Sequence, residues 1–147
     1  GSSLRFETTA QGSATRTEWV RVTGSGKVGI GTTTPNALLQ VAGTITGNPG
    51  VSNASTTIDF STGNLQYTTA NCQAYILHNV KDGGSYTFAV QGATAATCSF
   101  TAFSDAGTTA LTVHLPPDHG ATTVSKHTLY NLMNLGGHVY IAWTPGY

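Results

Sequence analysis

Charged side chains are what this 147-residue chain has least of. They make up 8% of it, six basic and six acidic residues, and the formal net charge is zero, whereas roughly 25% is usual in a soluble domain. The balance argues against nucleic acid or an anionic membrane surface as the main partner. Exposed strand edges are usually protected by Lys and Glu. A β protein with so few of them is expected to cover its edges with neighbouring chains, as an obligate oligomer.

Long apolar runs are also missing. No stretch approaches the roughly 18 residues of a transmembrane span, so we expect no membrane insertion. The first residues, GSSLRFE, lack the apolar core of a signal peptide. Gly1 and Ser2 resemble a cloning remnant, and the abrupt start predicts a fragment of a longer protein.

Acidic residues are too few and too scattered to predict an enzyme. A glycosidase needs two carboxyl groups about 5–10 Å apart across the scissile bond, and the nucleophile motif GxSxG does not occur. We therefore expect neither catalysis nor a cofactor, and the alternative left open is a trimeric depolymerase in which carboxylates from neighbouring chains pair. The six acids are Glu7, Glu18, Asp59, Asp82, Asp105 and Asp118.

Only two cysteines are present, Cys72 and Cys98, so only one intrachain pairing is possible. A bridge suits an exported protein, whereas free thiols would act as small apolar fillers. Cys98 shares strand parity with Phe100, which places it on an inward face. Both alternatives stay open at this point.

The segment from Lys27 to Ile45 is glycine-rich and thin in apolar bulk, yet its apolar residues alternate. Alternation with a period of two places these residues on one face of a strand. One strand face with so little apolar surface cannot form a core within a single chain. It is therefore expected to pack against the same face of other copies of the chain. The alternating residues are Val28, Ile30, Leu39, Val41, Gly43 and Ile45.

Glycines and a proline interrupt this alternation. Three glycines would let three chains approach closely at an axis, although flexible turns are the alternative interpretation. Pro35 favours a short helical turn over Asn36–Leu38, because proline suits the first helical position. The three glycines are Gly29, Gly31 and Gly43.

The patterns VGIGT, TTP and LLQVAGTI resemble the shaft-to-tip neck of trimeric fibre proteins, namely bacteriophage tail fibres and adhesive surface fibres of bacteria. Further along, GGSYTFAVQG, HLPPDHG and VYIAWTPGY are similar to the tip domains that follow such necks. The resemblance implies a trimeric, β-rich tip used for recognition, and it names no ligand. A related branch ends in a self-cleaving chaperone with a long helical C-terminal segment, which this sequence lacks.

Three regions are predicted: a fibre neck over residues 1–46, a linker over 47–56 and a tip domain over 57–147. The tip domain shows many short alternating segments separated by turn clusters such as KDGG, PPDHG and LGG, which favours an antiparallel β-sandwich of jelly-roll type. The segment HTLYNLMNL fits either a strand or a helix, and its setting favours a strand. The fold class is thus all-β, assembled as a parallel homotrimer.

Aromatic and polar side chains in the tip domain are candidates for sugar binding, because sugars stack on aromatic rings and form hydrogen bonds around them. Tyr140 has the opposite parity to Val139 and Ile141 and is expected at the surface. Trp143 shares their parity, so packing is its alternative role. The candidate ligand-binding residues are Tyr67, His114, Asp118, His119, Tyr140 and Trp143.

The segment HLPPDHG concentrates three groups that often bind transition metals. Because no fourth ligand is evident nearby, no metal is predicted within one chain. An ion on a threefold axis, held by one histidine from each chain, is an open alternative. His114, His127 or His138 would supply that histidine.

The sequence therefore predicts an extracellular or cell-surface fibre tip, on a phage tail or a bacterium, that recognises a surface glycan without covalent chemistry. Three weak sites on one rigid head would gain avidity. A surface protein of a target cell is the other ligand class left open. The competing hypothesis is a structural cap that ends the fibre and sets trimer registration without binding a ligand.

Overall fold

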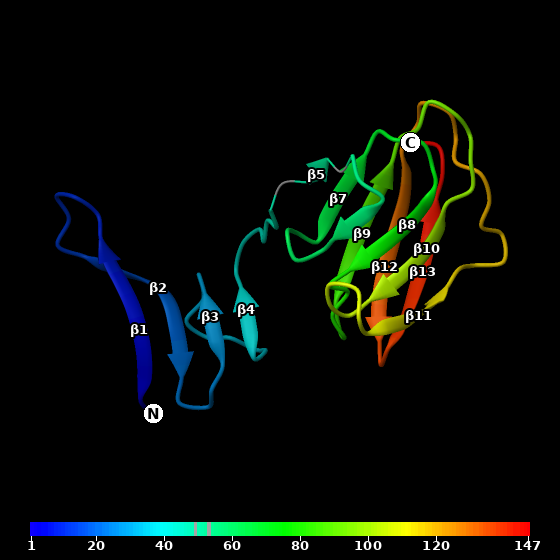
Figure 1. The fold of residues 1–147 in the computed structure, drawn as a ribbon. Helices are drawn as coiled ribbons and strands as arrows, with labels where there is room; N and C mark the ends of the chain where they lie inside the picture. The colour runs from blue at the N-terminus through cyan, green and yellow to red at the C-terminus, as the bar shows by residue number, and fades with distance from the viewer. Residues whose placement is uncertain (49, 53) are drawn as a thin grey trace. The chain divides into compact units, whose positions relative to one another are not determined.

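The computed structural model describes residues 1–48, 50–52 and 54–147. These residues form thirteen β-strands and no helix, which confirms the predicted all-β class (Figure 1). The helical turn expected at Asn36–Leu38 is wrong, because these residues form bends. With no helix in the described ranges, none is long and apolar enough to cross a membrane. The chain divides into two compact units, residues 1–46 and 47–147.

The first unit, which we call the neck, is a single four-stranded sheet. Its strands are β1 (Ser3–Thr9), β2 (Arg16–Thr23), β3 (Val28–Ile30) and β4 (Leu39–Val41), in that order across the sheet. The first two pairings are antiparallel and the third, between β3 and β4, is parallel. The alternating residues Val28, Ile30, Leu39 and Val41 therefore lie on strands that pair directly with one another, whereas Gly43 and Ile45 lie beyond the end of β4.

One face of the neck sheet is apolar on all four strands. Cross-strand partners share a face, and the register aligns apolar residues with apolar residues at two levels. We call the resulting surface the apolar neck face. Its two rows are Leu4–Val22–Val28–Leu39 and Phe6–Val20–Ile30–Val41.

A β-bulge extends this face and separates it from the charged side chains. The register of β1 and β2 shifts between Phe6 and Glu7, and such a shift reverses the facing of the residues beyond it. The Trp19 indole N–H donates to the Thr8 hydroxyl at 2.7 Å, and Thr8 has the parity of Phe6. The indole thus joins the apolar neck face.

The opposite face of the neck carries an ion-paired cluster. The Arg21 guanidinium donates two hydrogen bonds to the Glu18 carboxylate, at 2.5 and 2.7 Å, and Arg5 lies 3.6 Å from the same group. The hydrogen bond from Arg21 holds the pKa of Glu18 below its usual value. The neck sheet is therefore amphipathic, with charge on one face and bare apolar side chains on the other.

The second unit, which we call the head, contains nine strands in one curled sheet. The order across the sheet is β5-β7-β9-β12-β13-β11-β10-β8-β6. The bounds are β5 (Val51–Ser52), β6 (Thr57–Asp59), β7 (Leu65–Thr68), β8 (Ala74–His78), β9 (Ser85–Val90), β10 (Ser99–Phe103), β11 (Ala110–His114), β12 (Thr128–Leu135) and β13 (His138–Thr144).

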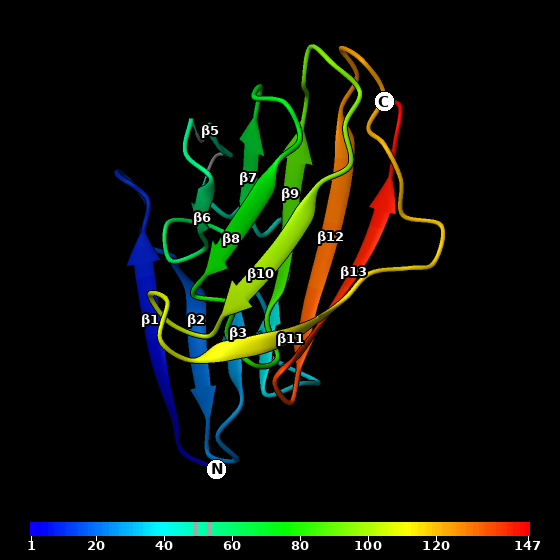
Figure 2. The same ribbon diagram turned by 45° about the vertical axis from the view of Figure 1, so that its right-hand side comes forward.

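The predicted antiparallel sandwich is wrong in its pairing, because the head sheet is mixed. β12 pairs antiparallel with β9 and β13, but β8 pairs parallel with β6 and β10, and β7 pairs parallel with β9. From β6 to β10 the chain alternates between two layers (Figure 2). Strands two apart in sequence therefore become parallel neighbours, in a solenoid-like winding.

The predicted linker also contains a strand. β5 lies within residues 47–56 and pairs in parallel with β7 at the edge of the head sheet. Such an edge pairing is made by main-chain hydrogen bonds and needs no apolar pattern in the sequence. Pro49 and Asn53, which also belong to the predicted linker, lie outside the described residues.

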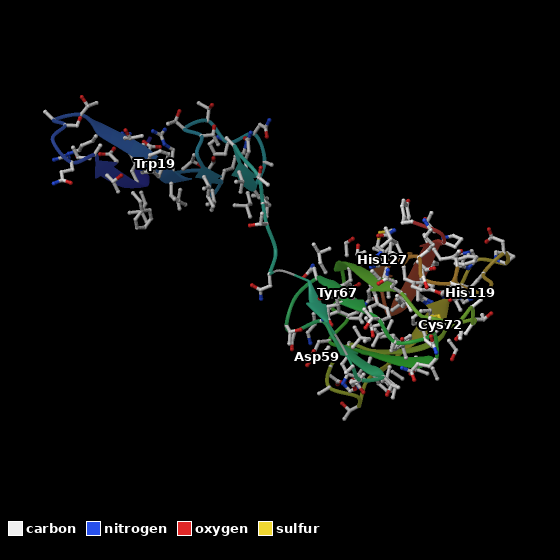
Figure 3. The ribbon with its side chains drawn as sticks, turned by 90° about the horizontal axis from the view of Figure 1, so that it is seen from above. Trp19, Asp59, Tyr67, Cys72, His119 and His127 are labelled. Carbon is white, nitrogen blue, oxygen red and sulfur yellow. A yellow bond between two sulfur atoms is a disulfide. The ribbon has the colours of Figure 1, made fainter. Side chains whose placement is uncertain are left out.

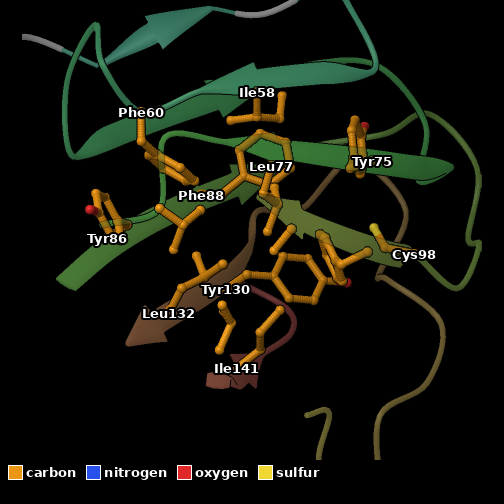
Figure 4. Close-up of a cluster of buried hydrophobic side chains, with 14 of the residues drawn as sticks. Ile58, Phe60, Tyr75, Leu77, Tyr86, Phe88, Cys98, Tyr130, Leu132 and Ile141 are labelled. Atoms are coloured by element: carbon orange, nitrogen blue, oxygen red, sulfur yellow. The ribbon is translucent and has the colours of Figure 1, made fainter. Parts of the chain in front are cut away.

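The core of the head lies between the two layers, β6-β8-β10 on one side and β9-β12-β13 on the other (Figure 4). Phe88 is fully buried and meets the Tyr75 ring edge-on, with 4.9 Å between ring centroids. Tyr130 and Leu132 are buried while Met133 is exposed, which is the pattern of a strand. The ambiguous segment HTLYNLMNL is thus the strand β12.

A disulfide joins Cys72 and Cys98, so the bridge is the alternative that the fold adopts. Cys72 precedes β8 and Cys98 precedes β10, which are parallel neighbours in one layer. Both cysteines are buried, and the Cys72 sulfur lies 3.7 Å from the Tyr130 hydroxyl. The bridge therefore ties the starts of two strands to the core.

Replacing both cysteines in the Cys72→Ala/Cys98→Ala variant is expected to lower the free energy of unfolding by roughly 3.5 kcal/mol. The bridge closes a loop across 26 residues of sequence, and its removal returns conformational entropy to the unfolded chain. Urea unfolding measures the loss. Reductant should destabilise the wild type equally and leave the double variant unchanged. An unchanged midpoint in the variant would contradict this assignment.

Candidate ligand-binding surface

The structure distributes the six predicted ligand-binding residues over three places in the head. His114 and Tyr140 lie together on β11 and β13. His119 and Trp143 meet where the β11–β12 connection folds back over the sheet, and Asp118 belongs to that connection. Tyr67 lies on β7, apart from His119 in Figure 3. The six residues therefore do not form one site.

The pair of His114 and Tyr140 comes from the parallel register of β11 and β13. Val113 and Val139 face inward, so His114 and Tyr140 stand opposite each other on the outer face. Their rings stack with centroids 4.8 Å apart and planes 14° apart. Tyr140 is 46% exposed. The stack holds the exposed ring of Tyr140 in a defined orientation. Such a fixed ring suits a surface on which a ligand stacks.

His138 is a neighbour of this stack that was not among the predicted ligand-binding residues. Its Nδ1 lies 2.9 Å from Nε2 of His114. His138 begins β13 immediately after the tight Gly136–Gly137 turn, in which both glycines have positive φ. The shared parity of His138 and Tyr140 was visible in the sequence, but their pairing with β11 was not.

A shallow hollow of about 270 Å³ adjoins Tyr140 on the same face. The Thr87 hydroxyl donates to Oδ1 of Asn131 at 2.9 Å, which orients the amide nitrogen of Asn131 at the rim. Met133 stands between Ser85 and Tyr140 in the register of β9, β12 and β13. The lining residues are Ser85, Asn131, Leu132, Met133, Tyr140, Ile141 and Ala142.

No protein-family model, curated protein or solved structure matches this chain. The resemblance to fibre proteins therefore rests on the sequence patterns quoted above. We call the stack, His138 and the adjoining hollow the Tyr140 surface.

His119 and Trp143 pack against each other. The His119 ring meets Trp143 edge-on at 5.2 Å between centroids and also approaches Tyr130 at 5.8 Å. Its Nε2 atom is buried and has no hydrogen-bond partner among the described residues, and burial lowers the pKa of this imidazole. Trp143 packs against the core. The packing alternative expected for Trp143 is thus the observed arrangement.

Tyr67 shares the outer face of the sheet with Tyr140 but lies three strands away. It pairs with Ala89 on β9, two strands before β13 in the sheet order. Its ring is partly exposed, and the backbone of Gly50 passes against it. A small ligand bound at Tyr140 would not reach this position.

Most acids of the head serve turns. Asp59 accepts hydrogen bonds from Ser61 N–H and from Asn79, and Asp82 accepts from two glycine N–H groups. Asp105 binds the hydroxyl and N–H groups of Thr108 and Thr109, and these bonds, chiefly that of the Thr108 hydroxyl, lower its pKa. Within the described ranges, no three His, Cys, Asp or Glu side chains gather as a metal site.

Proposed function

We propose that this chain is the tip end of a parallel homotrimeric fibre on a cell or phage surface, and that its head recognises a surface glycan without covalent chemistry. The exposed Tyr140 ring, stacked on His114 beside a hollow with polar groups, carries the recognition part of the proposal. The apolar neck face carries the trimeric part.

The neck supports oligomer formation because its apolar face has no cover within residues 1–46. Leu4, Phe6 and Leu39 are 59%, 57% and 61% exposed, and the unit consists of one sheet layer. Burying such a side chain fully stabilises by about 1.5–3 kcal/mol. Three identical sheets packed with these faces inward would bury all of them and leave the Arg21–Glu18 ion pairs in solvent.

The Tyr140 surface supports a neutral ligand. The strands β7, β9, β12 and β13 contain no Lys, Arg, Asp or Glu, so a charged group bound there would find no opposite charge on these strands. An aromatic ring flanked by amide, hydroxyl and imidazole groups matches the apolar face and hydroxyl rim of a neutral sugar. Three such surfaces per fibre would add avidity to weak single-site binding.

The Tyr140→Ala variant is expected to lose at least about tenfold in binding to the glycan that the wild type selects, as truncation of a central aromatic contact does. A glycan array probed with labelled protein in its native oligomeric state identifies that glycan, and titration of the free sugar quantifies the loss.

The matched control is Tyr67→Ala, which removes an exposed ring from the same face three strands away. It should bind as the wild type does. An equal loss of glycan binding in both variants would mean that the ligand contacts the whole outer face of the sheet rather than the hollow beside Tyr140. Unchanged binding of Tyr140→Ala would overturn the assignment of the ligand to Tyr140.

A structural cap that ends the fibre without a ligand is the second candidate function. The apolar neck face favours it as strongly as it favours a binding tip, because both need the trimer. The two functions differ at the Tyr140 surface alone. A wild-type trimer that binds neither glycans nor target-cell surface proteins would support the structural cap and overturn the recognition function.

A further inference from the structure

The two imidazoles at the edge of the Tyr140 surface are hydrogen-bonded to each other. Nε2 of His114 and Nδ1 of His138 are 2.9 Å apart. Two nitrogen atoms bound to one ion at about 2.0–2.1 Å and at right angles are separated by about 2.9 Å. Right-angled nitrogen ligation is the geometry of square-planar or tetragonal Cu²⁺ and Ni²⁺ sites.

The fold holds this pair in place on both sides. β11 and β13 are adjacent parallel strands, with Thr112 opposite His138 and His114 opposite Tyr140. The stack on Tyr140 restricts the His114 ring, at 4.8 Å between centroids. The two imidazole planes differ by 29°. Two ligands fixed in this way lose little freedom when an ion binds, which raises affinity.

The surroundings of the pair neither repel nor attract a cation by charge, because β11, β12 and β13 contain no Lys, Arg, Asp or Glu. Both histidines are exposed, so water can complete the coordination shell. In the metal-free protein the two nitrogens share one hydrogen bond. With an ion bound, each ring is a neutral ligand whose proton lies on its other nitrogen.

We propose that His114 and His138 form a two-histidine site for one divalent transition-metal ion per chain, with Cu²⁺ bound most tightly and Ni²⁺ less so. The site adds a metal-dependent property to the head that does not rest on glycan recognition. An ion there would lie beside Tyr140, which is one of the residues that line the hollow.

The test is titration of the untagged full chain with Cu²⁺, followed by calorimetry and by electron paramagnetic resonance of the bound ion. The wild type should bind one ion with two nitrogen ligands. His114→Gln and His138→Gln should each weaken binding by about tenfold or more. The double variant measures the background from the N-terminal amine and the other three histidines.

His127→Gln is the matched control, because it removes a histidine from the same domain outside the pair. It should retain the wild-type affinity, and the melting temperature of all variants without metal should match the wild type. Cu²⁺ should raise the melting temperature of the wild type and of His127→Gln, and it should leave that of the variants at His114 and His138 unchanged. Wild-type affinity in either His114→Gln or His138→Gln would overturn the site, and so would a bound ion with a single nitrogen ligand.

Discussion

Leu39→Asp is expected to convert the proposed trimer into monomers, lowering the mass in solution from three times 15.2 kDa to 15.2 kDa. Leu39 ends one row of the apolar neck face and is 61% exposed in the single chain. Packing of three such faces would place three carboxylates in one apolar interior, where unpaired charge costs several kcal/mol. Sedimentation or light scattering measures the mass.

The matched control is Gln40→Asp, which adds the same charge at the next residue of β4. Gln40 faces the other side of the sheet, where its side chain accepts a hydrogen bond from Asn36 N–H at 2.9 Å. This variant should keep the wild-type mass. Wild-type mass in Leu39→Asp would contradict burial of the apolar neck face between copies. Loss of the oligomer in both variants would point to a general failure of β4.

Phe88→Ala is expected to lower the free energy of unfolding of the head by about 3–5 kcal/mol. Phe88 is fully buried between the two layers and packs edge-on against Tyr75. Its truncation removes apolar contact and leaves a cavity that the strands cannot close. Because a domain is stable by only about 5–15 kcal/mol, the melting temperature should fall on the order of 20 °C.

Leu65→Ala is the control for Phe88→Ala, since Leu65 is a large apolar residue on the neighbouring strand β7 but is half-exposed. Its effect should stay within about 0.5 kcal/mol. Circular dichroism during thermal unfolding compares the two variants. An unchanged melting temperature for Phe88→Ala would mean that the core is not where these contacts place it.

Several strands of the head could be predicted because the alternation of apolar and polar residues is a local feature of the sequence. In β13 the buried residues Val139 and Ile141 are spaced by two, and an extended backbone directs alternate side chains to opposite faces. The segment that forms β12 was ambiguous by this reasoning, and its setting rather than its own pattern favoured a strand. The inference for β13, by contrast, needs only a few neighbouring residues.

Strand direction could not be predicted in the same way. Parallel and antiparallel strands have the same side-chain period, so the alternation of apolar residues in β8 and β10 does not indicate that the two strands pair in parallel. The prediction of an antiparallel sandwich assumed that consecutive strands are neighbours. In the head they belong to opposite layers from β6 to β10, and the neighbours come from the next turn of the winding.

The candidate site shows the same division. His114 and Tyr140 were each predicted as binding residues, but their stacking depends on the register of two strands that are 26 residues apart in sequence. The same register brings His138 next to His114 and so makes it part of the Tyr140 surface. His119, another predicted binding residue, has its ring against Trp143, which comes from a distant strand. Whether a side chain in a long connection is exposed depends on where that connection folds back.

By itself the sequence determined the all-β class, the amphipathic alternation of the neck and the inward faces of the main strands, because backbone geometry ties these features to residues only two positions apart. The layer of each strand, the parallel registers, the disulfide and the composition of the Tyr140 surface were decided by the tertiary structure. These features depend on which distant segments bury one another's apolar faces, and that choice is made by the packing of the whole chain.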